Sequence, residues 1–470
     1  MTDLRKRTID RALASYDDGR FLDMLTRLVA VPTESHPPEH KADLERYCET
    51  LIRPILEEMG HTVRIVPNTL AEHGPFLISE RIESADAPTL LLYGHGDVVR
   101  AMPERWREGL DPWRVSVEGD RIYGRGTVDN KGQHLILLEA LRAQLQERGA
   151  HGFNTRMLIE MGEEAGSPGL REFLTDHADL CAADVFIALD GPRQSMTVPD
   201  LTLGTRGSFA VDLEVDLREG SHHSGHWGGV LADPAAILSH AIGTILDRNG
   251  KILVEGWRPK DVPASVQRAA RAARRDIVPG LPEADPDWGE PGLSAQEKIY
   301  AWNSAIVLSM ISGQPENPVP AVAGSASARI QLRHIVDTPA DIVLTALRTH
   351  LDSNGFEGVG LRPVVERDMF PPHRTDPDDP WVKTLAASMK VTSGHEPNII
   401  PGIGASGPSA WFAEALDLPV IWIPHSYAGC GQHGPNEHGM APLFRDGLGL
   451  MAGIFHDIAE DAYRAKPASE

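Results

Sequence analysis

Residues that can bind metal ions follow apolar segments at several places in this sequence. The clearest case is the apolar run 90–93, which leads through a glycine to His95 and, two residues later, to Asp97. An uninterrupted apolar run predicts a strand that is covered on both faces, and the carboxyl ends of such strands are where open α/β sheets place their chemistry. Comparable residues follow later segments of the chain, at Asp129, Glu164, Asp190 and His433.

Together with His95, these four residues provide two imidazoles and three carboxylates, the ligand set of a hydrolytic site with two metal ions. Zinc accepts mixed nitrogen and oxygen ligands, and two ions about 3.5–4 Å apart need a carboxylate that bridges them. We predict that Asp129 is the bridge, because the glycines around it allow a tight turn. His95 and His433 then bind at opposite ends of the pair. Glu164 binds one ion and Asp190 binds the other.

Two further acids lie beside these ligands in the sequence. A metal-bound imidazole usually donates its second ring N–H to a carboxylate, and Asp97 is predicted to play this part for His95. Glu163 precedes a predicted ligand and is itself left free. A free carboxylate beside water that a metal ion activates can take a proton from that water and pass it to a leaving amine. Glu163 is therefore predicted to be the general base in the hydrolysis of an amide bond.

The segments that carry these residues resemble those of the M20 metallopeptidase family. The motifs GHGDVV, GRGTVDNKG, MGEEAGS and HGPNE occur in the family's order between about Leu90 and Glu437. The resemblance implies the same five metal ligands, with His433 and not His438 as the last, and Glu163 as the base. It also implies an α/β fold: a zinc-peptidase-type catalytic domain with a central mixed sheet flanked by helices, plus an inserted α+β domain for lid closure and dimerisation.

The resemblance assigns further roles outside the metal ligands. His223, in the family's HSG motif, would reach into the active site of a partner subunit and stabilise the developing oxyanion, so a homodimer is expected. Asn317 and Arg333 resemble lid residues that contact substrate, and a planar guanidinium suits a terminal carboxylate. Ser406 lies in a turn similar to the family's substrate loop and would add a donor for that carboxylate. The alternative is that Ser406 caps the helix that begins near Pro408.

The order of the expected elements divides the chain into two domains. Apolar spacing predicts a βαβ pattern in the first part, and the alternating strand 209–215 begins a different pattern. We expect a discontinuous catalytic domain over residues 1–204 and 372–470, and an inserted domain over 205–371. Segment 260–293 is expected to be an elaborated, largely surface region without a stable core pattern. The expected helices are 8–29, 39–59, 133–147 and 381–393, and the expected strands are 62–66, 89–93, 155–160, 185–189 and 419–423.

Composition limits the possible classes of protein. A chain of 470 residues exceeds what one hydrophobic core usually organises, and 41% hydrophobic with 24% charged residues is ordinary for a soluble protein. A formal charge of −22 argues against nucleic acid as a partner. The sequence has no apolar run that predicts a membrane span or a signal peptide. Three cysteines, far apart and odd in number, fit a reducing compartment, so a cytoplasmic location is expected.

The expected reaction is the hydrolysis of an amide bond in a small substrate that has a free carboxylate. The position of Asp190 is occupied by Asp in the dipeptidase branches of the family and by Glu in the deacylase branches. This resemblance favours a dipeptidase. An N-acyl amino acid amidohydrolase is an alternative, because its substrates present the same amide and carboxylate. A third hypothesis is a catalytically silent protein that binds metal and associates with a partner. It is disfavoured because a protein without catalysis has no need for a free acid at position 163, where burial beside metal ions is costly. Two divalent ions are expected, most readily zinc, with manganese or cobalt as alternatives.

Overall fold

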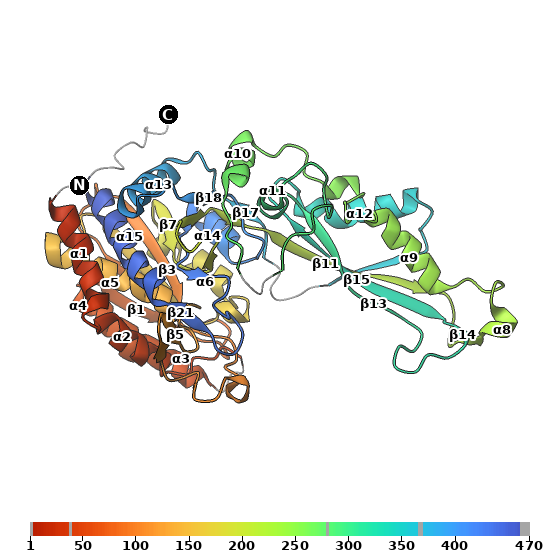
Figure 1. Ribbon diagram of the computed structural model, residues 1–470, viewed down its shortest axis with the longest axis horizontal. Coiled ribbons are helices and arrows are strands. Elements are labelled where there is room, and N and C mark those ends of the chain that lie inside the picture. Colours follow the sequence, from red (N-terminus) through yellow and green to blue (C-terminus); the bar gives the residue numbers. More distant parts are fainter. Residues whose placement is uncertain (1–2, 37–39, 279–281, 365–369, 461–470) are drawn as a thin grey trace.

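The computed structural model describes residues 3–36, 40–278, 282–364 and 370–460. Figure 1 shows two parts: a layered part with helices on both sides of a sheet, and an elongated part that extends away from it. Among the described helices, none combines the length and the apolar character that crossing a lipid bilayer requires.

The layered part is organised by an eight-stranded mixed sheet. Its central strand β3 is parallel to both of its neighbours, β6 and β7, whereas β1, β2 and β6 pair antiparallel at one side. The expectation of an α/β fold with a central mixed sheet is therefore confirmed. In spatial order the strands are β1 (Thr62–Val66), β2 (Phe76–Arg81), β6 (Asn154–Glu160), β3 (Thr89–His95), β7 (Val185–Ala188), β19 (Val420–Trp422), β9 (Asp200–Thr202) and β18 (Asn398–Ile400).

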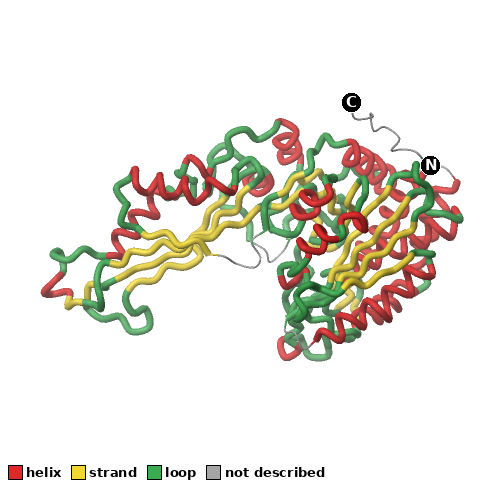
Figure 2. The backbone as a smooth tube through the Cα atoms, turned by 180° about the vertical axis from the view of Figure 1, so that it is seen from behind, coloured by secondary structure: helices red, strands yellow, loops and turns green. Residues whose placement is uncertain are grey.

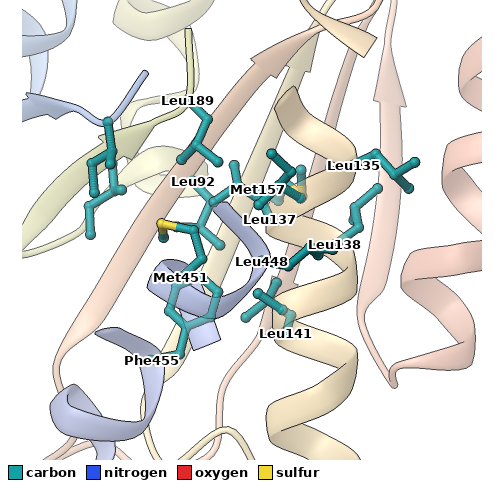
Figure 3. Packing of buried hydrophobic residues seen from close by; sticks show 14 of the residues in the cluster. Leu92, Leu135, Leu137, Leu138, Leu141, Met157, Leu189, Leu448, Met451 and Phe455 are labelled. Atoms are coloured by element: carbon teal, nitrogen blue, oxygen red, sulfur yellow. The ribbon is translucent and has the colours of Figure 1, made fainter. Parts of the chain in front are cut away.

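Helices cover both faces of this sheet because consecutive residues of its central strands are apolar: Leu90 and Leu92 of β3 are buried on one face, and Leu91 and Tyr93 on the other. On one face, α5 (Lys131–Arg148) and α15 (Ala441–Ala459) pack together over Leu92, Met157 and Leu189 (Figure 3). α1 (Asp3–Asp17) and α13 (Pro380–Ser393) extend this layer. The other face packs against α6 (Leu170–Asp176), α7 (Ala178–Cys181) and α14 (Ser409–Leu416) around Phe186 and Phe412.

Of the two helices expected near the amino terminus, the first is divided and the second is a nearly continuous helical run. The expected helix 8–29 is wrong as one element, since α1 ends at Asp17 and α2 (Arg20–Val29) begins after Gly19, whose φ of 88° breaks the helix. The expected helix 39–59 is α3 (Lys41–Arg46), a π-helical turn (Tyr47–Ile52) and α4 (Arg53–Glu58). Residue 39 lies outside the described residues.

The elongated part contains a four-stranded antiparallel sheet with helices along one face (Figure 2). The apolar faces of α9 (Pro234–Ile245) and α12 (Val343–Ser353) form its core with the central strands. β12 (His222–His223) pairs with β14 (Ala321–Val322) beside α8 (Ser224–Trp227) at the end of this part. In spatial order the main sheet is β13 (Ser304–Ser312), β15 (Ser325–His334), β11 (Gly207–Asp216) and β16 (Gly360–Val364).

The chain passes between the two parts where β10 (Gly204–Thr205) pairs with β17 (His373–Arg374). A Cβ atom at position 204 would lie 2.0 Å from the carbonyl oxygen of His373, so only glycine allows the two backbones to approach this closely. This pairing fixes the points at which the chain leaves the large sheet and returns to it.

Segment 260–293 is largely exposed, as expected, but it also contributes to a small core, which the sequence did not predict. It contains α10 (Ala264–Ala272), whose Val266 and Ala270 are buried with Ile400 and with Tyr300 of α11 (Ala295–Tyr300). The spacing of these two small apolar residues is one helical turn, but a single turn is too short a pattern to predict a core contact. Residues 279–281 lie outside the described residues.

Candidate metal centre and active site

His95 is the last residue of β3 and is completely buried. Its Nε2 atom lies 3.1 Å from Asp129 Oδ1 and 3.4 Å from Asp190 Oδ2. Asp190 follows β7, which is parallel to β3, so His95 and Asp190 leave the sheet at the same edge. His95, Asp129 and Asp190 each offer one atom to a group that could hold a metal ion, with these atoms within 4.8 Å of one another.

Asp129 also belongs to a second group of this kind. Its Oδ2 atom lies 2.9 Å from His433 Nε2, and the same imidazole nitrogen lies 3.0 Å from Glu164 Oε2. Within the described part of the chain, this group and the His95 group are the two found, and Asp129 is common to both. One carboxylate that faces two sites with its two oxygens has the geometry required of a bridge between paired ions.

The two ends of this constellation differ in exposure. The His95 side chain is fully buried, whereas 57% of the His433 side chain is exposed. His433 lies in the loop between β20 (Ser426–Tyr427) and β21 (His438–Met440), and its backbone has a left-handed φ of 60°. Solvent and substrate can therefore reach the group from the side of His433.

The charges of these side chains favour cations between them. Burial, together with the negative charge of Asp129, raises the pKa of Glu164 to about 8. Burial and Asp129 likewise raise the pKa of Asp190. The Oε1 atom of Glu164 is buried and has no hydrogen-bond partner among the described residues. Bound divalent cations would balance the crowded carboxylates and reverse these shifts, so the donor set fits a pair of such ions.

Asp97 joins His95 to the loop that carries Glu163 and Glu164. Its carboxylate Oδ1 lies 3.4 Å from His95 Nδ1, whose nearer neighbour is the Asp97 carbonyl oxygen at 3.1 Å. The same carboxylate accepts hydrogen bonds from the backbone N–H groups of Glu163 and Glu164, both at 3.1 Å. Burial raises the pKa of the Glu163 carboxyl well above its usual range, and the charge of Glu164 adds to this. A carboxyl group with a raised pKa is suited to proton transfer near neutral pH.

Glu437 holds the turn that carries Asp129, a role that sequence reasoning missed. Its buried Oε1 accepts the N–H groups of Val128 at 3.0 Å and Asp129 at 3.3 Å. Its Oε2 accepts the N–H of Gly126 at 3.0 Å and Arg125 Nη1 at 2.6 Å. The motif HGPNE contains this acid, but its four partners lie 308 to 312 residues earlier, so only the fold reveals the contact.

Two glutamines were also missed. Gln432 Nε2 donates to Asp129 Oδ2 at 2.6 Å, and Gln133 Nε2 donates to Asp190 Oδ1 at 3.5 Å. Each amide orients a carboxylate that the metal-site prediction uses. Their proximity to Asp129 and His433 in the sequence was the available signal.

His223 and Asn317 lie far from this centre within one chain. His223 is exposed in β12, and its Nδ1 accepts the N–H of Gly225 at 3.1 Å. Asn317 is exposed in the loop between β13 and β14. Figure 1 places β14 and α8 at the end of the elongated part opposite the large sheet.

Arg333 and Ser406 contact each other where the two parts meet. Arg333 Nη1 donates to Ser406 Oγ at 2.6 Å, and this hydroxyl donates to the carbonyl oxygen of Arg206 at 2.7 Å. The alternative that Ser406 caps a helix is wrong, since α14 starts at Ser409 with Pro408 in the capping position. The structure thus brings together two of the residues that were predicted to bind a substrate carboxylate.

Comparisons with known proteins agree with these observations. The sequence model of peptidase family M20/M25/M40 matches residues 91–457. A cysteinylglycine-S-conjugate dipeptidase of Corynebacterium striatum is 29% identical over 397 residues, which are 83% of this chain and 84% of that protein. A Beta-Ala-His dipeptidase of Mus musculus is 25% identical over 408 residues, 82% of this chain and 80% of that protein. Human carnosine dipeptidase 1 shares the fold, with a TM-score of 0.73, 23% identity and coverage of 98% of this chain and 99% of that chain. This chain belongs to peptidase family M20/M25/M40 and is a metal-dependent peptide hydrolase.

Proposed function

We propose that this enzyme is a dipeptidase that binds two divalent cations between His95, Asp129, Glu164, Asp190 and His433. The observation that carries the proposal is the pair of three-residue groups that have Asp129 in common, with one carboxylate oxygen of Asp129 facing each group. When bound there, such cations act as Lewis acids on the scissile carbonyl and lower the pKa of water. Zinc is our first choice, because it accepts this mixture of imidazole and carboxylate ligands. Manganese and cobalt accept the same donors.

The protons are moved by Glu163 in this proposal. Its carboxylate takes a proton from the attacking water as the water oxygen bonds to the amide carbon. The carbon–nitrogen bond then breaks, and Glu163 returns the proton to the leaving nitrogen. Asp97 holds the backbone of Glu163 and keeps the ring of His95 oriented, so the base and the ligand keep a fixed relation.

The substrate that we propose is a dipeptide with a free carboxylate at its carboxyl end. Arg333 and Ser406 provide a guanidinium and a hydroxyl for that carboxylate. The relatives that are named dipeptidases, matched over most of both chains, support a dipeptide. The test is a panel of dipeptides and N-acetyl amino acids, assayed with zinc, manganese or cobalt and analysed for released amino acids. Release of acetate without dipeptide cleavage would favour an N-acyl amino acid amidohydrolase instead.

We further propose that residues 205–371 form a lid domain through which two copies associate, with His223 of each completing the other's active site. The support is β13, an edge strand with no described strand on its outer side. An exposed apolar edge strand favours association with another chain. Sedimentation equilibrium tests this, since a single species at the monomer mass would exclude it. The exposed apolar residues of this strand are Ile306, Val307, Leu308, Met310 and Ile311.

A cytoplasmic location is also our proposal. Cys48, Cys181 and Cys430 are buried as free thiols, which suits a reducing compartment. Fractionation of the native cells with an antibody against the protein would test it.

A further inference from the structure

A buried arginine lies where the chain crosses from the large sheet to the elongated part. Arg206 stands between β10 and β11, and 9% of its surface is exposed. Its Nη1 donates to Ser304 Oγ at 3.0 Å, and its Nη2 donates to the carbonyl oxygen of Gly404 at 3.3 Å. Its Nε is buried and has no hydrogen-bond partner among the described residues. Within that part of the chain, the guanidinium therefore contacts neutral oxygens and forms no ion pair.

A second arginine lies near this group. Ser406 connects them, because its hydroxyl donates to the carbonyl oxygen of Arg206 and accepts from Arg333. Burial lowers the pKa of Arg206 to about 10, and the positive charge of Arg333 contributes to the decrease. Ser304, which accepts a hydrogen bond from the Arg206 guanidinium, is also the strand partner of Arg333 between β13 and β15, so the two arginines are neighbours with the hydroxyl groups of Ser304 and Ser406 beside them.

These two arginines and Ser406 lie near the edge of the large sheet at which β7 and β19 end, and the candidate metal centre lies at the same edge. The loop with Ser406 leads into α14, whose first residue, Ser409, accepts a hydrogen bond from Trp422 Nε1 at 2.9 Å. Trp422 ends β19, which is parallel to β7. Asp190 follows β7 and therefore leaves the sheet at the same edge as Trp422.

A buried cation without an anion is costly, and a second cation nearby increases the cost. A carboxylate would relieve both, because arginine binds its two oxygens with paired N–H donors. We propose that Arg206 is a further binding residue for the substrate carboxylate, acting with Arg333 and Ser406, and that it makes the enzyme selective for substrates with a free carboxyl end. This inference rests on the proposed dipeptidase function.

The test compares a dipeptide with its carboxyl-terminal amide in wild type and in Arg206→Met, which keeps most of the side-chain volume. We expect kcat/KM for the free acid to fall about 10- to 100-fold, the effect of losing a charge-assisted hydrogen bond. The value for the amide should change little, so the acid-to-amide ratio falls by nearly the same factor. An unchanged ratio would overturn the proposal.

A matched control separates binding from a general disturbance of the crossing. Arg374→Met removes an arginine of β17 that pairs with Asp337, at the same crossing. We expect this variant to leave the acid-to-amide ratio at the wild-type value, whatever it does to overall activity. Arg206→Lys, which keeps the charge but loses the planar fork, should give an intermediate ratio. If Arg206→Met does not fold, the Lys variant decides, and a wild-type ratio there rejects the proposal.

A binding measurement keeps this inference distinct from the proposed function. Acetate should raise the melting temperature of the wild type relative to chloride at equal ionic strength, and Arg206→Met should lose that increase. An enzyme that cleaves no dipeptide but shows this difference would contradict the proposed function and support the carboxylate site. Equal responses of the two proteins to acetate would overturn the carboxylate site.

Discussion

At the residue scale, two adjacent acids have different surroundings. Glu164 points an oxygen at His433 and belongs to the group that shares Asp129. Glu163 belongs to neither group, although its backbone is held by the same Asp97 carboxylate. Adjacent positions in a short 3-10 turn point their side chains in different directions, which lets one acid bind a cation while the other exchanges protons.

Replacing Glu163 and Glu164 separately therefore gives distinct outcomes. For Glu163→Gln we expect kcat to fall about 10²- to 10⁴-fold, the usual contribution of a general base, while metal content measured by inductively coupled plasma analysis stays at the wild-type value. Glu164→Gln is the matched variant, and we expect it to lower metal content. Wild-type turnover in Glu163→Gln would remove Glu163 from the mechanism.

The hydrogen bonds of Glu437 lead to a second prediction at the residue scale. Its carboxylate accepts three backbone N–H groups and one guanidinium group around the turn before α5. In Glu437→Gln the amide cannot accept all of these bonds, so the turn loosens and Asp129 loses its orientation. We expect metal affinity to fall about 10- to 100-fold in competition with a chelator. An unchanged affinity would show that Asp129 is held by other contacts.

At the element scale, local patterns predicted the strands that end at the candidate site and the helix that begins there. β3, β6 and β7 were predicted because long apolar runs end in a polar residue, and α5 because its apolar residues have helical spacing. β2 was missed, because its three apolar residues are followed by Ser79, Glu80 and Arg81, which gives neither an uninterrupted apolar run nor a regular alternation. The contacts of Arg206 and Glu437 could not be predicted, since each depends on segments that meet only in the folded chain.

Two buried histidines contact the outer strands of the large sheet. Their lowered pKa values predict that acid lowers the stability of the folded protein. Thr155 of β6 lies 3.4 Å from a ring nitrogen of both His61 and His151, and His61 Nδ1 lies 3.1 Å from Ser79 Oγ in β2. Burial lowers the pKa of His61 to about 3 and that of His151 to about 4. Both rings are therefore neutral in the folded protein, whereas the unfolded chain takes up protons below a pH of about 6.5.

The unfolded state thus binds more protons than the folded state between pH 6.5 and the lowered pKa values. The free energy of unfolding falls as pH decreases through this window and is unaffected by these groups above it. In His151→Gln we expect the loss between pH 7 and pH 5 to be about 2 kcal/mol smaller than in wild type, measured by urea unfolding. The exposed His240, replaced by Gln, is the control and should leave the loss unchanged. If the free energy of unfolding of His151→Gln decreased between pH 7 and pH 5 by as much as that of the wild type, the prediction would be contradicted.

At the scale of the whole molecule, the predicted active-site residues are distributed over three places. The candidate ligands and Glu163 lie at the edge of the large sheet, and Arg333 and Ser406 lie at the crossing. His223 belongs to β12, which pairs with β14 at the far end of the elongated part (Figure 1). One chain in this conformation does not bring His223 to its own Glu163. If His223 acts in catalysis, a second copy must supply it, as the proposed dimer does.

Mixing two inactive variants tests this arrangement. Glu163→Gln lacks the base but keeps His223, whereas His223→Ala keeps the base, so a mixed dimer contains one complete site. Random pairing makes half of the dimers mixed, each with one working site of two, so activity should return to about a quarter of the wild-type value. Glu163→Gln mixed with Glu164→Gln is the control, because both defects lie in the same part of the site and no complete site can form. Activity no higher than that of the separate variants, in a sample that has exchanged subunits, would mean that His223 does not act across the dimer.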